Sequence, residues 1–310
     1  MEQIKKMNKV MVLMSTYNGE KYLEEQIDSI LAQKGIEVKL IIRDDGSKDS
    51  TCEIIHRYIR KYTNIILYER NNVGFVKSFS ELVKLGLQDS FSSDYYAFSD
   101  QDDIWHVDKL QTACKALSLV DKSLPSLYMS NSMKIDVERR ELGLFVKCRD
   151  SQSIARGSAL IHGSVQGCGM VFNKRAAELF NSIPPQNVWH DRWLFLICFY
   201  LGKVVYNNTP LFYYRMHGCN TLAKKINLKE YVEKQLRSFF KKPLHLAFAE
   251  EFYAKFSTNI STYDKKLFKL YFSYRYNLLS KIKILYQADF LYPYNKGLFL
   301  YICKVLLGRV

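Results

Sequence analysis

Residues 10–31, VMVLMSTYNGEKYLEEQIDSIL, join a short apolar run to an amphipathic pattern across a polar turn. The run at residues 10–15 is continuous and has the length of a buried strand. After a Tyr-Asn-Gly turn, apolar side chains return at helical spacing, at Leu23, Ile27, Ile30 and Leu31. This stretch therefore predicts a buried strand followed by a helix.

The same pairing of strand and helix recurs three more times. Apolar runs of strand length lie at residues 38–42, 65–68 and 95–98, and each precedes apolar residues at helical spacing. Four such alternations predict an α/β fold with a mostly parallel sheet and helices on both faces. Further along, we expect one more strand at residues 126–131 and a buried helix at residues 194–201.

The charge of the chain is unevenly distributed. Its 310 residues, 48% of them apolar, suffice for one large α/β domain and an appendage. The net charge of +14 is concentrated beyond residue 223, where 17 Lys and Arg stand against 6 Asp and Glu. The first 223 residues carry 28 basic and 25 acidic side chains. We therefore predict a boundary near residue 223, followed by a basic, aromatic-rich and helical region at 224–310.

The cysteines and the apolar stretches indicate the compartment. The seven cysteines form no Cys-x-x-Cys pair, and no apolar leader with a small-residue cleavage site opens the sequence. This pattern indicates reduced thiols and a cytoplasmic protein. The longest apolar stretches, residues 194–201 and 298–307, fall well short of the ~20 residues that span a bilayer. We therefore expect no membrane-spanning segment.

Polar residues follow three of the predicted strands. Thr16, Tyr17 and Asn18 follow the first strand, DDGS at 44–47 follows the second, and DQDD at 100–103 comes soon after the fourth. In parallel sheets, ligands bind beyond the carboxyl ends of the strands. The sequence therefore predicts one site built from these loops.

The stretch FSDQDDIW at residues 98–105 holds three carboxylates, Asp100, Asp102 and Asp103. Oxygen ligands at this spacing can converge on Mg²⁺ or Mn²⁺, and the cation then offsets their mutual repulsion. The alternative is an acidic turn that faces water and caps the next helix. A D-x-D triplet is too short a motif to decide between the two.

Seven segments, in this order along the chain, resemble the family 2 glycosyltransferases of the GT-A fold. They are STYNGEKYLEEQIDSIL (15–31), DDGSKDST (44–51), NVGFVKSF (72–79), FSDQDDIWHVDKL (98–110), GCGMVFNK (167–174), HDRW (190–193) and YRMHG (214–218). More narrowly, the set is similar to bacterial members that build surface polysaccharides such as O-antigen or capsule, of the rhamnosyltransferase type. The resemblance implies a GT-A domain at 1–223, with its nucleotide-sugar half at 1–110 and its acceptor half at 111–223.

The resemblance implies a nucleoside-diphosphate sugar as donor, linked to UDP or dTDP, with dTDP-rhamnose as one candidate. Thr16, Tyr17 and Asn18 would line the nucleobase and ribose. Asp44, with Asp45 beside it, would accept the N3–H of a uracil or thymine. The other interpretation of this aspartate pair is a strand-to-helix turn that caps the following helix.

For the cation, Mn²⁺ or Mg²⁺, the resemblance implies Asp102 as the main ligand. Asp100 would contact ribose, the metal or a water on it, and Asp103 would act outside the ligand shell. His217 would complete the coordination or touch the diphosphate, and Arg215 would pair with phosphate. The cation would then stabilise the departing diphosphate. Without the resemblance, a lone histidine such as His217 is more often satisfied by the surrounding protein.

Asp191 in HDRW is the candidate general base. The family generally inverts the anomeric centre, so a carboxylate must take the proton from the acceptor hydroxyl. The alternative role of Asp191 is a cap at the start of the predicted helix. His190 stands where many relatives carry Glu, which leaves the acceptor type open. Trp189 and Trp193 would stack on an acceptor sugar or belong to the core.

Residues 265–285 place apolar side chains at helical spacing and basic side chains mostly on other faces. This pattern predicts one amphipathic basic helix. The helix would pack on its own domain, dock on an anionic cytoplasmic membrane surface, or mediate self-association into a homo-oligomer. Membrane docking suits an enzyme whose saccharide acceptor is carried on a polyprenyl lipid, and it would place the protein peripherally on the inner face of the cell membrane.

Several functions compete with the leading prediction of a metal-dependent inverting glycosyltransferase. One is a catalytically inactive sugar-nucleotide-binding subunit of a glycan assembly complex, although the retained Asp102 and Asp191 argue against it. A phosphohydrolase with a D-x-D-x-T loop is disfavoured because Ile104 stands where the threonine is needed. Nucleic-acid binding is not expected despite a pI of 9.3, because no such motif occurs and the acidic sheet edge would repel phosphate.

Overall fold

The computed structural model of the chain describes residues 7–146, 155–161, 165–186, 188–218 and 244–290, together with residues 302, 305 and 306. The chain divides into two compact units. The first comprises Met1–Arg149, Val165–Pro185 and Trp189–His217, and the second comprises Asp150–Ser164, Gln186–Val188 and Gly218–Val310. The predicted boundary at residue 223 lies outside the described residues.

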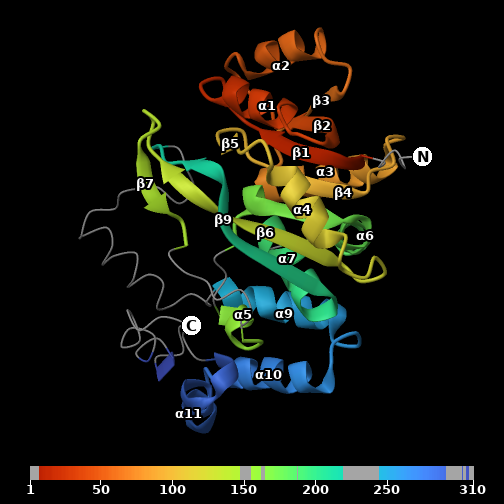
Figure 1. The fold of residues 1–310 in the computed structure, drawn as a ribbon. Helices are drawn as coiled ribbons and strands as arrows, with labels where there is room; N and C mark the ends of the chain where they lie inside the picture. The colour runs from red at the N-terminus through yellow and green to blue at the C-terminus, as the bar shows by residue number, and fades with distance from the viewer. Residues whose placement is uncertain are drawn as a thin grey trace. The chain divides into compact units, whose positions relative to one another are not determined.

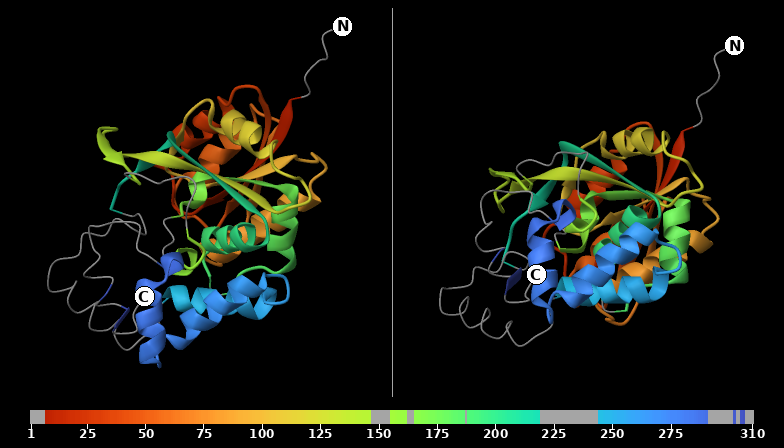
Figure 2. Two further views of the ribbon diagram at one scale, coloured as in Figure 1. Left: turned by 60° about the horizontal axis from the view of Figure 1, so that its bottom comes forward. Right: turned by 90° about the horizontal axis from the view of Figure 1, so that it is seen from below.

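The first unit contains a nine-stranded mixed sheet (Figure 1), with strand order β3-β2-β1-β4-β8-β6-β9-β5 and β7 paired to β6. The strands are β1 Asn8–Thr16, β2 Ile36–Asp44, β3 Ile65–Glu69, β4 Tyr95–Ser99, β5 Ile104–Trp105, β6 Ser126–Ile135, β7 Glu141–Leu144, β8 Met170–Asn173 and β9 Lys203–Arg215. Strands β3, β2, β1 and β4 are parallel, and so are β6 and β9. Strand β8 runs antiparallel to both β4 and β6. The views in Figure 2 show how strongly the sheet twists.

Helices cover both faces of this sheet. They are α1 Leu23–Leu31, α2 Thr51–Ile59, α3 Phe75–Gln88, α4 Lys109–Leu117, α6 Lys174–Ser182 and α7 His190–Leu201, with the short 3₁₀ helix η1 at Gly167–Gly169. Helices α1, α2 and α4 share a core with Val10, Val12 and Met14 of β1. Helix α3 lies on the other face, where Gly86 packs against Met11 and Leu13. The four predicted strand and helix units are therefore confirmed, and so is the predicted helix at 194–201.

The second unit contains α5 Ser158–Ile161, α9 Leu244–Phe256, α10 Thr262–Ser273, α11 Leu278–Tyr286 and η2 Ala288–Phe290. The prediction of one continuous helix at 265–285 is wrong. The chain breaks after α10 because the Asn277 side chain caps α11, where it accepts a hydrogen bond from the Leu279 amide at 2.8 Å. Part of the predicted apolar face, including Tyr271 and Tyr274, is fully buried.

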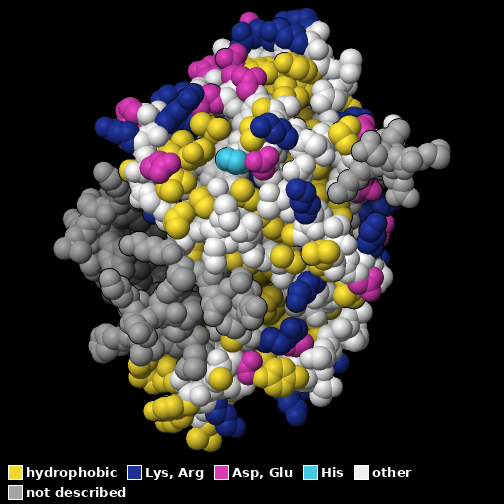
Figure 3. Space-filling model, in the orientation of Figure 1, with side chains coloured by type: hydrophobic (Ala, Val, Ile, Leu, Met, Phe, Trp, Pro, Cys, Tyr) yellow, Lys and Arg dark blue, Asp and Glu magenta, His cyan; other side chains and the backbone are white. Residues whose placement is uncertain are grey.

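Helix α11 instead presents apolar side chains on the surface. In Figure 3, hydrophobic side chains gather over this helix at the lower edge of the view. The exposed residues are Tyr276, Leu278, Leu279, Ile282 and Tyr286, and we call them the α11 patch. No helix in the described part of the chain is both long and apolar enough to cross a bilayer. The cysteines that the structure describes, Cys52, Cys114, Cys168 and Cys198, are free thiols.

Candidate active site

The carboxyl ends of β1 and β2 lie side by side, so that Thr16 pairs in register with Asp44. The hydroxyl of Thr16 donates to Asp44 Oδ1 at 2.9 Å. Both side chains are buried. The adjacency of the first two polar loops, predicted from the sequence, is therefore observed.

Asp44 and Asp45 are already engaged by the chain itself. Asp44 Oδ2 accepts from the amides of Gly46 at 3.0 Å and Ser47 at 2.8 Å, and Asp44 Oδ1 also accepts from the Ser47 hydroxyl at 2.5 Å. Asp45 pairs with the buried guanidinium of Arg43 and accepts from two amides at the start of α3. These contacts stabilise the turn after β2, but neither carboxylate caps the following helix α2, whose N-cap is Ser50. Each oxygen of Asp44 already accepts two hydrogen bonds, so a contact with a nucleobase would replace one of them, and the Ser47 hydroxyl can rotate away.

The loop after β1 contacts the acidic loop after β4. The amide of Tyr17 donates to Gln101 Oε1 at 2.8 Å, and Gln101 Nε2 returns a bond to the Tyr17 carbonyl at 3.1 Å. Asn18 has a positive φ of 48°, and its side chain accepts from the Lys48 amide at 2.9 Å. The ring of Tyr17 remains half exposed at this edge. It is therefore accessible to a ligand.

The three clustered carboxylates, Asp100, Asp102 and Asp103, lie in different surroundings. Asp102 Oδ2 lies 2.7 Å from Nε2 of His217, so residues 115 positions apart meet as the resemblance implied. Asp103 is fully buried, and its carboxylate interacts with the Cys168 thiol but accepts no N–H or O–H hydrogen bond from the described residues. Burial, reinforced by the neighbouring carboxylates, raises the pKa of Asp103 well above its usual value. For the same reasons the pKa of Asp100 rises to about 7.

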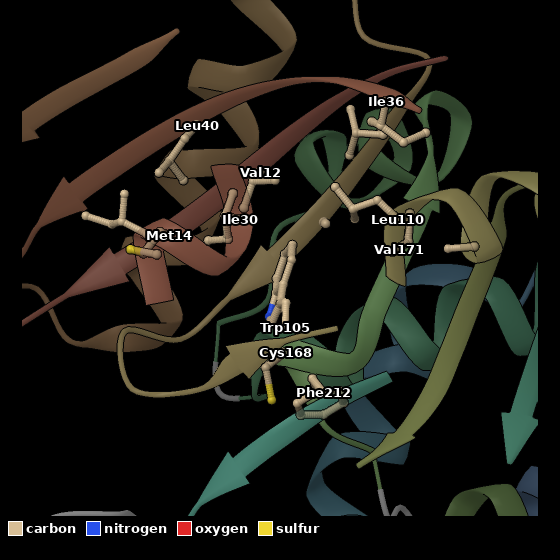
Figure 4. Packing of buried hydrophobic residues seen from close by; sticks show 14 of the residues in the cluster. Val12, Met14, Ile30, Ile36, Leu40, Trp105, Leu110, Cys168, Val171 and Phe212 are labelled. Atoms are coloured by element: carbon tan, nitrogen blue, oxygen red, sulfur yellow. The ribbon is translucent and has the colours of Figure 1, made fainter. Parts of the chain in front are cut away.

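Lys109 and Cys168 lie beside Asp103. The Lys109 ammonium is completely buried, donates to the Cys168 carbonyl at 2.6 Å and lies 3.1 Å from the centroid of the Trp105 ring. Figure 4 shows Trp105, Cys168 and Phe212 together in this part of the core. Burial lowers the pKa of Lys109 to about 7, although the acidic neighbours oppose the shift. Ligand atoms of Asp100, Asp103 and Cys168 all lie within 4.8 Å of one another.

These donors fit a divalent cation. Carboxylate oxygens suit Mn²⁺ or Mg²⁺, whereas the His217 imidazole and the Cys168 thiol are softer ligands. Burial and the mutual repulsion of the carboxylates raise the pKa of Asp100 to about 7, and a bound cation would offset that repulsion. Asp102 with His217 forms the partly exposed candidate pair, with side chains 18% and 13% accessible. If the cation also contacts a bound ligand, the residues that hold the cation must lie on the exposed side of this cluster.

Asp191 lies in the first turn of α7, where it accepts from the Arg192 amide at 2.6 Å. Burial raises the pKa of its carboxyl to about 6. Its charge contributes to the raised pKa of Asp100, so the structure brings Asp191 near the acidic loop. The N-cap of α7 is Trp189, so Asp191 is an acidic residue of the first turn and not the predicted cap.

His190 and Gly167 fix the surroundings of Asp191. The His190 ring stacks on Phe79 at 3.9 Å between centroids and meets the edge of Phe98 at 5.0 Å. Its nitrogens have no hydrogen-bond partner within the described structure, and burial lowers the pKa of the imidazole to about 3. A Cβ added at Gly167 would lie only 2.9 Å from His190 Nε2.

The two tryptophans of HDRW differ. Trp193 is fully buried and donates from Nε1 to the Ile183 carbonyl at 2.7 Å, so it belongs to the core. Trp189 is 37% exposed and remains the candidate for stacking on an acceptor.

Arg215 does not reach outward. Its side chain is 1% exposed, its Nε donates to the Asp102 carbonyl at 3.1 Å, and its Nη2 donates to Glu25 at 2.5 Å. Glu25 was not predicted, because its sequence signal is that of an ordinary exposed helical glutamate. Lys109 was also missed as a site residue, although Glu25, Lys109 and Gly167 all lie within the quoted motifs.

Comparisons with known proteins agree with this geometry. The family model described as "Glycosyl transferase family 2" matches residues 11–179. A dTDP-rhamnosyl transferase, RfbG of Shigella flexneri, is 31% identical over 70% of this chain and 75% of its own length. An uncharacterised glycosyltransferase of Nostoc is 26% identical over 68% of this chain and 66% of its own length.

Solved structures share the fold at low sequence identity. Staphylococcus aureus TarS in complex with UDP-GlcNAc superposes with a TM-score of 0.59 at 14% identity, over 97% of this chain and 90% of that one. The mannosyltransferase PcManGT of Pyrobaculum calidifontis, in complex with GDP-Man and Mn²⁺, gives 0.54 at 16% identity, over 98% and 86%. The fold is therefore GT-A, as predicted, and the chain belongs to glycosyl transferase family 2, whose members transfer sugars from nucleotide-sugar donors.

Proposed function

We propose that the protein is an inverting, metal-dependent glycosyltransferase that moves rhamnose from dTDP-rhamnose to a saccharide acceptor. The choice of sugar is supported by the 31% identity to a protein named as a dTDP-rhamnosyl transferase. The observation that carries the proposal is the neighbourhood of Asp191 and the acidic loop. One site there combines a raised-pKa carboxylate with the Asp102 and His217 pair.

In this reaction Asp191 accepts the proton of the acceptor hydroxyl while that oxygen bonds to the anomeric carbon of the donor. The bond from this carbon to the diphosphate oxygen breaks, and its electron pair stays on dTDP. A carboxyl with a pKa of about 6 is a stronger base than an exposed aspartate, yet it is mostly ionised at neutral pH. When bound, Mn²⁺ or Mg²⁺ would neutralise the charge of the departing diphosphate, and Asp102 with His217, and Asp100 beside them, would hold it.

The nucleotide would lie along the loops after β1 and β2. Thr16, Tyr17 and Asn18 would line the base and ribose, and Asp44 would take the N3–H of thymine once the Ser47 hydroxyl rotates away. Asp45 would act indirectly, through the turn that it holds.

The experiment is a transfer assay with dTDP-rhamnose, UDP-glucose and GDP-mannose, each with Mn²⁺ or with EDTA. We expect turnover with dTDP-rhamnose that needs the cation, and a loss of about 100-fold or more in Asp191→Asn. Asp121→Asn, at an exposed loop position of the same unit, is the matched control. Binding of donor without hydrolysis or transfer under any condition would favour the inactive sugar-nucleotide-binding subunit instead.

We propose further that the acceptor is carried on a polyprenyl lipid and that the α11 patch docks on an anionic cytoplasmic membrane surface. Leu278, Leu279 and Tyr286 are each more than half exposed, and the exposed Lys283 lies on the same helix. Apolar anchors beside lysines bind such surfaces through burial and charge together.

The test is co-sedimentation with phosphatidylglycerol vesicles. We expect salt-sensitive binding that Leu278→Asp/Leu279→Asp removes, whereas Leu119→Asp, at an exposed leucine of the other unit, keeps it. An unchanged pelleted fraction in the double variant contradicts the docking. A fall in sedimentation coefficient in that variant without vesicles would indicate a homo-oligomer interface instead.

A further inference from the structure

Residues near the end of β9 contact both the backbone carbonyl and the side-chain carboxylate of Asp102. Its carbonyl oxygen accepts from Arg215 Nε at 3.1 Å, and its carboxylate Oδ2 lies 2.7 Å from His217 Nε2. The backbone contact leaves the carboxylate free of the guanidinium. A cation ligand is thus oriented without being neutralised by an arginine.

The far side of Arg215 is fixed by α1 and the residue before it. Arg215 Nη2 donates to Glu25 Oε2 at 2.5 Å, and the guanidinium lies 4.5 Å from the centroid of the Tyr22 ring. The same Tyr22 ring lies 5.0 Å from the His217 ring. One helix end therefore supports both residues that contact Asp102.

Glu25 gives the buried Arg215 a charged partner. Arg215 is 1% exposed, so its charge needs a partner inside the protein. Glu25 is 35% exposed and supplies that partner through one oxygen, while its other oxygen pairs with Arg139 at 2.6 Å. The Arg139 side chain is 62% exposed, so this second pair contributes little.

A direct phosphate contact fits Arg215 less well. Two groups of its fork are used for Asp102 and Glu25, and a guanidinium at this burial presents almost no surface to a ligand. A planar fork can hold two acceptors in a fixed relation, which a single ammonium cannot. The geometry of Arg215 is that of a brace.

We propose that Glu25 and Arg215 form a positioning pair: Glu25 fixes the guanidinium, the guanidinium fixes the backbone of Asp102, and Asp102 with His217 is thereby held ready for a divalent cation. The inference rests on the proposed function for the presence of that cation. Partners that orient metal ligands in this way are worth a factor of about 10 to 100 in metal affinity.

The test measures Mn²⁺ binding by calorimetry on the full chain, with dTDP binding in EDTA as a second readout. Glu25→Gln keeps the shape of the side chain and removes its charge, and we expect the Mn²⁺ dissociation constant to rise about 10-fold. We expect the same loss in Arg215→Lys, and no further loss when the two changes are combined. Arg139→Gln breaks the exposed arm of the same carboxylate and is the matched control, with a change of less than about 2-fold expected.

Other outcomes overturn the inference. If folded Glu25→Gln has an unchanged Mn²⁺ dissociation constant, Glu25 does not position Asp102 and the inference is wrong. This result decides the question even if Arg215→Lys does not fold. Weaker dTDP binding in EDTA for Arg215→Lys alone would make Arg215 a phosphate ligand. Asp102→Asn separates the two proposals: if it keeps Mn²⁺ affinity, the proposed cation site fails, and if it loses affinity while Glu25→Gln does not, only the positioning pair fails.

Discussion

Gly167→Ala is the sharpest single-atom perturbation of the proposed base. The added Cβ would lie 2.9 Å from His190 Nε2 and 3.5 Å from Asp191 Cβ. His190 has little room to retreat, because its ring stacks on Phe79 at 3.9 Å and meets Phe98 at 5.0 Å. The start of α7 must therefore shift, and Asp191 moves with it.

The magnitude follows from the contact. Overpacking by one methyl in a tight core costs about 1 to 3 kcal/mol of folding free energy. A displacement of a catalytic group that approaches 1 Å costs about 100-fold in rate. We expect kcat to fall by roughly 10- to 100-fold because only part of that displacement is required. The affinity for the nucleotide sugar should change little, because Thr16 and Asp44 of the proposed nucleotide site lie on β1 and β2, whereas Gly167 lies in η1.

The assay is rhamnose transfer at saturating donor, alongside thermal unfolding. Gly86→Ala is the matched control, because its Cβ would meet the Leu13 side chain at 3.1 Å, in the core beneath α3. That variant should keep kcat even if its melting temperature changes. A folded Gly167→Ala enzyme with wild-type kcat would refute the tight coupling of Gly167, His190 and Asp191.

Three further predictions concern charge. Because burial raises the pKa of Asp191 to about 6, the ionised base is lost below that pH, and kcat measured from pH 5 to 8 should fall on the acid side. Burial lowers the pKa of His190 from 6.5 to about 3, so its contribution to stability is full above pH 6.5 and is lost as the pH falls toward 3. The difference in melting temperature between His190→Phe and wild type (variant minus wild type) should therefore be more positive at pH 5 than at pH 7.5. Lys109→Met should lower the urea unfolding free energy by about 1 to 3 kcal/mol, because the buried Cys168 carbonyl loses the donor that lies 2.6 Å from it.

The sequence was informative where one periodicity ran long enough to be unambiguous. The apolar runs of β1, β2, β3 and β4 and the helical spacing after each predicted half of the sheet, because buried parallel strands are continuous and their helices amphipathic. Strands β5, β7 and β8 span two to four residues, too few to show a period. The antiparallel insertion of β8 between β4 and β6 therefore had no local signal.

The tail shows why a helical pattern alone was misleading. Apolar spacing continues through residues 274–277, and the pattern contains no glycine or proline that would mark an end. The break comes from Asn277, which is a weak helix breaker but a strong cap. Tyr271 and Tyr274 stack on each other at 5.4 Å and lie in the core of the second unit.

The candidate site shows a similar limit. The sequence predicted that the aspartates lie at one edge of the sheet, but it did not predict which role each of them has. Asp44 and Asp45 are engaged by amides, hydroxyls and Arg43, which makes them the rigid part of the turn after β2. Asp103 is the opposite case, because its buried carboxylate interacts with the weakly polar Cys168 thiol and accepts no N–H or O–H hydrogen bond in the described structure. Which carboxylate is structural depends on the donors that the fold brings to it, and those donors come from chain-distant segments. The same logic singles out Glu25, whose importance arises only because it neutralises the arginine that steadies the Asp102 backbone.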